Sequence, residues 1–158
     1  MTFISEKDIE NRRVFKGLDF LSECLRLRQE LKWENTVLTE LYAFISYAIS
    51  YPDYFLALVD SFNTLKSGVK NFLLVALCLK KVGHEPTGIR LDSGDLAELS
   101  KQSRKLIDET GKIYGYDFSN VKIVASNDIN EETLASFKEN GHKIDIFGIG
   151  TNLVTCQS

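Results

Sequence analysis

Cysteine is scarce in this sequence, and its three cysteines show no arrangement typical of a site. Cys24, Cys78 and Cys156 are an odd number, and no CxxC or Cys/His spacing is present. The pattern argues against a disulfide framework and against a zinc site with closely spaced ligands. Because Cys24 and Cys78 fall within apolar helical patterns, we expect buried, reduced thiols and a cytoplasmic location.

Long apolar runs and clustered positive charge are missing as well. The longest apolar run, Phe72 to Leu79, is too short to span a bilayer, and we expect no signal peptide. The net charge is −3, and lysine and arginine are scattered along the chain. Such a chain has no general attraction to nucleic acid or to anionic lipid, so we expect neither a nucleic acid nor a membrane as partner.

The 158 residues and the 44% hydrophobic content suffice for a substantial core. Residues 1–50 are predicted to be a helical lead-in segment. Apolar residues keep near-helical spacing from Phe20 to Leu31 and from Asn35 to Ser50, and Pro52 ends the second pattern.

Residues 51–158 alternate short, continuously apolar segments with helical patterns. Strands are predicted at 54–59, 87–91, 121–125 and 143–147, and helices at 66–82, 96–115 and 131–139. This βαβαβαβ order predicts an α/β fold with parallel strands whose faces are covered. The spacing of roughly 30 residues between strands suits either a barrel or a doubly wound sheet.

Polar or glycine-rich residues follow each predicted strand. In both architectures ligands bind beyond the carboxyl ends of the strands, so we expect the site there. The candidates, in chain order, are Asp60, Arg90, Asp92, Ser126, Asn127, Gly148, Gly150 and Thr151.

The charged candidates indicate a ligand that carries a sugar and an anion. Asp92, at a strand tip, would accept hydrogen bonds from sugar hydroxyls or bind Mg²⁺. Arg90 lies on the same face of the strand and should meet an anion, either on a ligand or on a neighbouring acid. Asp60 is a metal contact, a ribose contact or the cap of a turn. Asp95, with Glu98 three residues later, is predicted to cap a helix.

The segment Gly148-Ile149-Gly150-Thr151 is compact and uncharged. Successive backbone N–H groups in such a turn bind anions, so a phosphate is the natural ligand, with a plain tight turn as the alternative. The dinucleotide fingerprint is absent, because Leu153 stands where its third glycine would be. No Ser/His/Asp or Cys/His arrangement predicts a covalent nucleophile, so we expect charge neutralisation and positioning of substrates.

Four segments resemble nicotinate phosphoribosyltransferases, most closely the eukaryotic-type enzymes. The resemblance covers roughly residues 35 to 158, and its segments are 55–72, 88–96 (GIRLDSGDL), 125–132 and 147–156 (FGIGTNLVTC). It implies an irregular phosphoribosyltransferase-type α/β barrel, partly formed by residues 51–158, in a dimeric enzyme of NAD biosynthesis. The implied reaction converts nicotinate and phosphoribosyl pyrophosphate to nicotinate mononucleotide and pyrophosphate, coupled to ATP hydrolysis, with Mg²⁺ on the pyrophosphate.

The resemblance also implies roles for the candidates. Arg90 would meet the nicotinate end of the product and Asp92 the ribose hydroxyls. The nucleotide phosphate would be surrounded by Ser126, Asn127, Gly148, Gly150 and Thr151.

Two departures from the family leave two hypotheses open. The family's phosphorylated histidine lies in a His-Ser motif before the region that this chain covers. The first loop has Phe62 and Asn63 where a hydroxyl and a carboxylate are commoner. The chain is therefore interpreted as a fragment of an active enzyme, or as an inactive remnant that keeps nucleotide-phosphate binding. For the 158 residues alone we expect no ATP-coupled turnover.

A doubly wound signalling receiver is disfavoured. It would need an acidic pair after an early strand and a lysine at a late strand end, and neither is present.

Overall fold

The computed structural model describes residues 13–92, 94–125, 135, 138–139, 141–149 and 152–155. The described chain begins with an antiparallel hairpin of β1 (Val14–Phe15) and β2 (Leu18–Asp19). Helices α2 (Phe20–Glu30) and α3 (Leu38–Ser50) follow, which confirms the two helical patterns. The hairpin was not predicted, because two-residue strands are too short to show a pattern.

The next part of the chain contributes a five-stranded sheet, in the order β3-β4-β5-β6-β7. Its strands are β3 (Leu56–Leu58), β4 (Gly88–Leu91), β5 (Lys122–Ala125), β6 (Ile146–Ile149) and β7 (Asn152–Thr155). Strands β3 to β6 run parallel, which confirms the predicted α/β class. Strand β7 pairs antiparallel with β6 and was not predicted.

Two long helices connect the parallel strands. Helix α4 (Val69–Lys81) follows a five-residue π-helical turn, η1 (Thr64–Gly68), and helix α5 (Leu96–Tyr114) connects β4 to β5. Helix α5 ends at Gly115, whose φ of +73° is the left-handed conformation that glycine adopts without strain. The helix predicted at 131–139 lies mainly outside the described residues.

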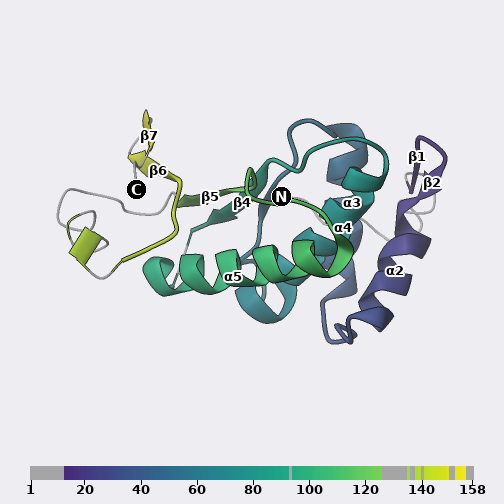
Figure 1. Cartoon of the computed structure of the whole chain (residues 1–158), viewed down its shortest axis with the longest axis horizontal. Helices are drawn as coiled ribbons and strands as arrows, with labels where there is room; N and C mark the ends of the chain where they lie inside the picture. The colour runs from purple at the N-terminus through teal and green to yellow at the C-terminus, as the bar shows by residue number, and fades with distance from the viewer. Residues whose placement is uncertain are drawn as a thin grey trace.

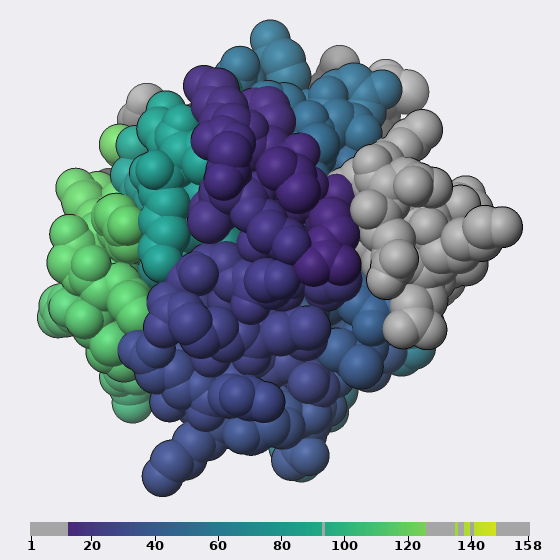
Figure 2. Space-filling view, turned by 90° about the vertical axis from the view of Figure 1, so that its right-hand side faces the viewer, coloured from purple at the N-terminus to yellow at the C-terminus, as the bar shows by residue number. Residues whose placement is uncertain are grey.

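Helix α4 is the centre of the packing. Nearly every residue from Val69 to Leu79 is buried, because α4 contacts α2, α3 and α5. Figure 1 shows α5 running alongside β4 and β5, with α2 and the β6-β7 hairpin at opposite ends of the molecule. In Figure 2 the segment from β1 towards α3, purple to blue, covers the middle of the face. One core therefore extends from Phe20 to Phe147 and includes both lead-in helices.

The fourth parallel strand begins later than its sequence predicts. It starts at Ile146, whereas residues 143–147 were expected, so the predicted position is wrong by about half a strand. The reason lies at Asp145, whose carboxylate accepts the Ile123 N–H at 2.8 Å in place of a backbone carbonyl. In the described part of the chain, no helix is long and apolar enough to cross a membrane.

Candidate functional site

The carboxyl ends of β3 and β4 meet at one edge of the sheet, which we call the carboxyl edge. Leu58 pairs in register with Arg90, so the residues that follow both strands leave the sheet side by side. The Asp60 carboxylate accepts the backbone N–H of Asp92 at 2.7 Å. Asp60 and Asp92, which are 32 residues apart in sequence, are thereby joined in space.

Arg90 and Asp92 form an ion pair at this edge. The Arg90 Nε donates to the Asp92 Oδ1 at 3.1 Å, and the side chains are 48% and 31% exposed. The two residues are neighbours on one face of the extended chain. The structure thus gives Arg90 a neighbouring acid as its anion. A half-exposed pair of this kind is weakly held, so a ligand carboxylate can compete for the guanidinium.

The candidates beyond β5 and β6 are only partly described. Ser126, Asn127, Gly150 and Thr151 lie outside the described residues. Gly148 lies within β6 and pairs with Leu153 of β7.

The turn predicted at 148–151 therefore begins later than expected, since Gly148 belongs to β6, and a phosphate contact of this segment stays a prediction. Pairing with β7 continues the strand through a residue that its sequence marks as a turn. Because β4, β5 and β6 are parallel, Ala125 and Ile149, the last residues of β5 and β6, lie towards the carboxyl edge.

The loop after β3 is fixed by local hydrogen bonds and a close contact. The Asn63 side chain accepts the Lys66 N–H at 2.9 Å and caps η1. A Cβ on Gly68 would lie 1.8 Å from the Val59 carbonyl oxygen, so η1 packs directly on the end of β3. Asn63 therefore has a structural role, and Phe62 beside it is 42% exposed. On the next loop, Asp95 accepts the Glu98 N–H at 3.2 Å, which confirms the predicted cap of α5.

A buried polar cluster beneath this loop was not predicted. Glu40 of α3 is fully buried, and its Oε1 accepts from the Ser67 hydroxyl at 2.8 Å and from the Asn71 amide at 3.0 Å. Burial raises the pKa of Glu40 above its ordinary value, against the opposing effect of these two hydrogen bonds. The sequence holds one signal of this cluster. Glu40 precedes Phe44 and Ala48 at helical spacing, which places an acid on an apolar face.

The carboxyl edge fits magnesium only together with a substrate. Among the described residues, no group of three or more His, Cys, Asp or Glu side chains is arranged to hold a metal ion. Asp60 and Asp92 provide two carboxylates. Mg²⁺ is commonly bound by one or two carboxylates with substrate phosphates and water. The residues present therefore fit a metal that arrives with a phosphorylated ligand.

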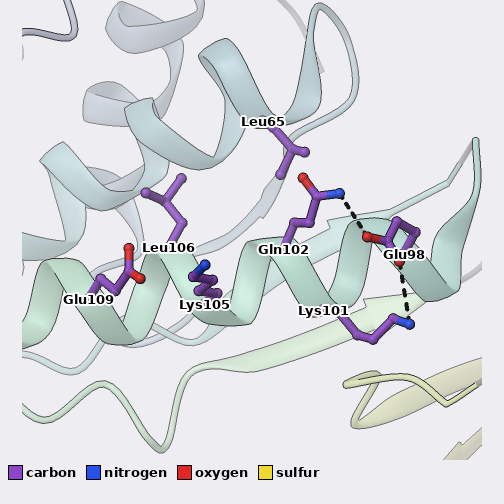
Figure 3. A pocket seen from close by; sticks show the side chains of 7 residues that line it. All are labelled: Leu65, Glu98, Lys101, Gln102, Lys105, Leu106 and Glu109. Atoms are coloured by element: carbon purple, nitrogen blue, oxygen red, sulfur yellow. Dashed lines mark hydrogen bonds and ion pairs between the residues drawn. The ribbon is translucent and has the colours of Figure 1, made fainter.

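A groove of about 500 Å³ lies between η1 and α5, away from the candidates. Figure 3 shows Leu65 facing the side chains of α5, where Glu98 accepts from Gln102 at 2.9 Å and pairs with Lys101 at 3.3 Å. None of the predicted site residues lines this groove. Three of its polar side chains, Glu98, Lys101 and Gln102, pair with one another along one helix, so the groove is a poor candidate for the site.

Comparison with known proteins gives one consistent family. The sequence profile of the Nicotinate phosphoribosyltransferase (NAPRTase) family matches residues 80–157. A Nicotinate phosphoribosyltransferase of Dictyostelium discoideum is 52% identical over 141 residues, which are 89% of this chain and 24% of the relative. Nicotinate phosphoribosyltransferase 1 of Arabidopsis thaliana is 51% identical over 127 residues, 78% of this chain and 22% of the relative.

A solved structure agrees with the sequence comparison. The crystal structure of human Nicotinic Acid Phosphoribosyltransferase matches with a TM-score of 0.75 and 27% identity, over 98% of this chain and 35% of the human chain. This chain spans about a quarter of the length of the curated relatives named above. The sequence comparison covers up to 89% of this chain and the structural comparison 98%, and the chain belongs to the nicotinate phosphoribosyltransferase family.

Proposed function

We propose that this chain forms part of the catalytic site of a nicotinate phosphoribosyltransferase. The reaction joins nicotinate to phosphoribosyl pyrophosphate, gives nicotinate mononucleotide and pyrophosphate, and is coupled to ATP hydrolysis. The observation that carries the proposal is the arrangement of Arg90, Asp92 and Asp60 at the carboxyl edge. It offers a cation for the nicotinate carboxylate and acids for the ribose within one small area.

Each residue of this arrangement has a stated role in the proposal. In the reaction the bond from ribose C1 to pyrophosphate breaks, and the nicotinate ring nitrogen forms the new bond to C1. Arg90 orients nicotinate through its carboxylate, and Asp92 accepts hydrogen bonds from the ribose hydroxyls. Asp60 holds the backbone of Asp92 through the 2.7 Å hydrogen bond. Positive charge develops on the ribose in the transition state, and nearby carboxylates stabilise it.

The remaining predicted site residues belong to the same proposal. Ser126, Asn127, Gly150 and Thr151, with the neighbouring Gly148, surround the nucleotide phosphate. Bound Mg²⁺ would neutralise the charge of the pyrophosphate leaving group. Among the described residues, the carboxylates of Asp60 and Asp92 would hold the ion. We also propose that the full-length enzyme is a cytoplasmic homodimer that acts in NAD biosynthesis.

A second candidate is an inactive relative that keeps only nucleotide-phosphate binding. The observation that favours it is the first loop, where Phe62 and Asn63 replace a commoner hydroxyl and carboxylate. The Asn63 Oδ1 accepts the Lys66 N–H and caps η1, so this oxygen is not directed at a ligand.

A chimera separates the two candidates. In the chimera, residues of this chain replace the aligned segment of the Dictyostelium discoideum relative. The two segments are 52% identical over 141 residues. Formation of nicotinate mononucleotide is then measured with nicotinate, phosphoribosyl pyrophosphate, ATP and Mg²⁺. We expect turnover, and we expect Asp92→Asn to lower kcat/KM about 100-fold, since a charge-assisted hydrogen bond contributes up to about 3 kcal/mol.

The control variant is Asp95→Asn. Asp95 caps α5 at the same loop, and asparagine caps helices as well as aspartate does, so activity should be kept. A folded chimera that binds the mononucleotide without turnover supports the inactive relative. Equal activity of the Asp92→Asn and Asp95→Asn variants would show that Asp92 is not at the site.

A further inference from the structure

The proposed function leaves the buried cluster of Glu40, Ser67 and Asn71 unexplained. These three residues come from α3, η1 and α4, and they are at most 2% exposed. Glu40 Oε1 receives hydrogen bonds from Ser67 and Asn71, at 2.8 and 3.0 Å. The Asn71 amide also donates to the Val37 carbonyl at 3.0 Å. Burying an acid in this way is unfavourable unless its second oxygen is also satisfied.

The cluster contains two buried oxygens that lack a hydrogen-bond partner in the described part of the chain, Glu40 Oε2 and Asn71 Oδ1. If Glu40 were ionised, both atoms would be acceptors and neither would satisfy the other. One proton on Oε2 turns it into a donor, with Asn71 Oδ1 as the complementary acceptor. Together with the existing bond from Asn71 Nδ2 to Glu40 Oε1, a bond from the protonated Oε2 to Asn71 Oδ1 would complete the two-bond pair of a carboxylic acid and a primary amide.

The cluster is connected to the carboxyl edge through the backbone. Ser67, which donates to Glu40, also accepts the Val37 N–H at 3.0 Å, so its position is set from two sides. Its neighbour Gly68 lies against Val59, where an added Cβ would be 1.8 Å from the carbonyl oxygen. Val59 directly precedes Asp60, the residue that accepts the Asp92 N–H. A shift of Ser67 would therefore move Asp60 relative to Asp92.

We propose that Glu40 is held as a neutral carboxylic acid paired with Asn71, and that this pair positions the contact between Asp60 and Asp92 at the carboxyl edge. Glu40 is a positioning residue, since it acts through Ser67 and Gly68. Its consequence for catalysis rests on the proposed function, whereas the Asp60–Asp92 contact is measurable without any substrate.

The surroundings of Glu40 favour the proton. Burial is the largest influence on its pKa and raises it, and the other two influences are the bonds from Ser67 and Asn71. The charged residues of η1 and the first turn of α4 are Lys66 and Lys70. Lys70 lies over the Trp33 ring, 5.6 Å from its centroid, and neither lysine influences the pKa of Glu40. The stabilisation is therefore complete below the ordinary glutamate pKa and is lost as the pH rises through the raised value.

The test is an NMR pH titration of the 158-residue chain and its Glu40→Gln variant, read at the Asp92 amide. Glutamine reproduces the neutral acid, since its oxygen accepts from Ser67 and its amide donates to Asn71 Oδ1. In the wild type we expect the Asp92 proton signal to move as the pH rises above the ordinary glutamate pKa, because Glu40 then loses its proton. The Glu40→Gln variant should lack this step. Identical titration of the two proteins would overturn the proposal.

Two further variants distinguish positioning from bulk stability. Glu40→Ala should shift the Asp92 amide signal upfield, because the hydrogen bond to Asp60 weakens, while Glu40→Gln keeps its position at low pH. Thr110→Ala is the control, because it removes a buried hydroxyl from α5, far from this cluster in sequence. If Glu40→Ala and Thr110→Ala lower the melting temperature but both leave the Asp92 signal in place, Glu40 is merely structural and the proposal fails. The Asp92 amide signal and the melting temperature are both measured without substrate. Failure of this proposal is therefore distinguishable from failure of the proposed function.

Discussion

Replacing Gly68 by alanine tests how closely η1 packs on β3. Gly68 has helical backbone angles, φ −54° and ψ −57°, and directly precedes α4. Helix propensity alone predicts that alanine stabilises such a position by up to about 1 kcal/mol. Packing predicts the opposite, since the new Cβ would lie 1.8 Å from the Val59 carbonyl oxygen and 2.6 Å from its carbonyl carbon.

The size of the effect follows from the distance. Carbon atoms of this kind do not approach within 3.0 Å, so Gly68 and Val59 would have to separate by more than 1 Å. Both obstacles are backbone atoms, which no change of rotamer moves. Overpacking of a core costs about 1–3 kcal/mol, and we place Gly68→Ala at about 3 kcal/mol. In a domain of this size that lowers the melting temperature by about 6–12 °C.

Urea denaturation followed by tryptophan fluorescence measures the change. Trp33 is the single tryptophan and is 9% exposed, so its emission reports unfolding. The control is Gly115→Ala, where φ is +73° and nothing lies within 4 Å of the added Cβ. Backbone strain there should cost roughly 1 kcal/mol. If Gly68→Ala unfolds at the same urea concentration as the wild type, or at a higher one, the contact between η1 and β3 is refuted.

Two further predictions concern ionisable groups near the N-terminal helices. The hydrogen-bonded Arg13 lowers the pKa of Asp19 to about 2. The ion pair therefore stabilises the fold above the ordinary aspartate pKa, and this stabilisation is lost as the pH falls towards 2. In the Asp19→Asn variant the melting temperature should no longer show this dependence on acid pH. Cys24 and Cys78 are buried with their sulfur atoms 3.6 Å apart, and burial raises the pKa of Cys24. In a Cys156→Ser variant both thiols should react with a disulfide reagent only after denaturation, and fast labelling of the native chain would contradict their placement.

The sequence contains enough to predict the order of most elements. Short apolar segments separated by helical patterns indicate parallel strands, and this signal does not depend on contacts between distant residues. The strands β3, β4 and β5 begin within two residues of their predicted starts. Capping signals are equally local. Asp95 is identified by Glu98 three residues later, and the structure shows the predicted bond.

Errors occur where a distant partner decides the conformation. Gly148 looks like a turn residue, yet pairing with Leu153 keeps it within β6. The sequence predicts a strand over residues 143–145, yet the Ile123 N–H donates to the Asp145 carboxylate. In both cases the local signal is outweighed by hydrogen bonds to another strand.

The candidate site shows the same division. The residue types at the ends of β3 and β4, an arginine and acids, can be predicted from local sequence, because side chains alternate between the two faces of any strand. Only the tertiary structure decides that Asp60 holds the Asp92 amide and that Glu40 meets Asn71. Residues more than 30 positions apart come within hydrogen-bonding distance only when the helices and strands pack together.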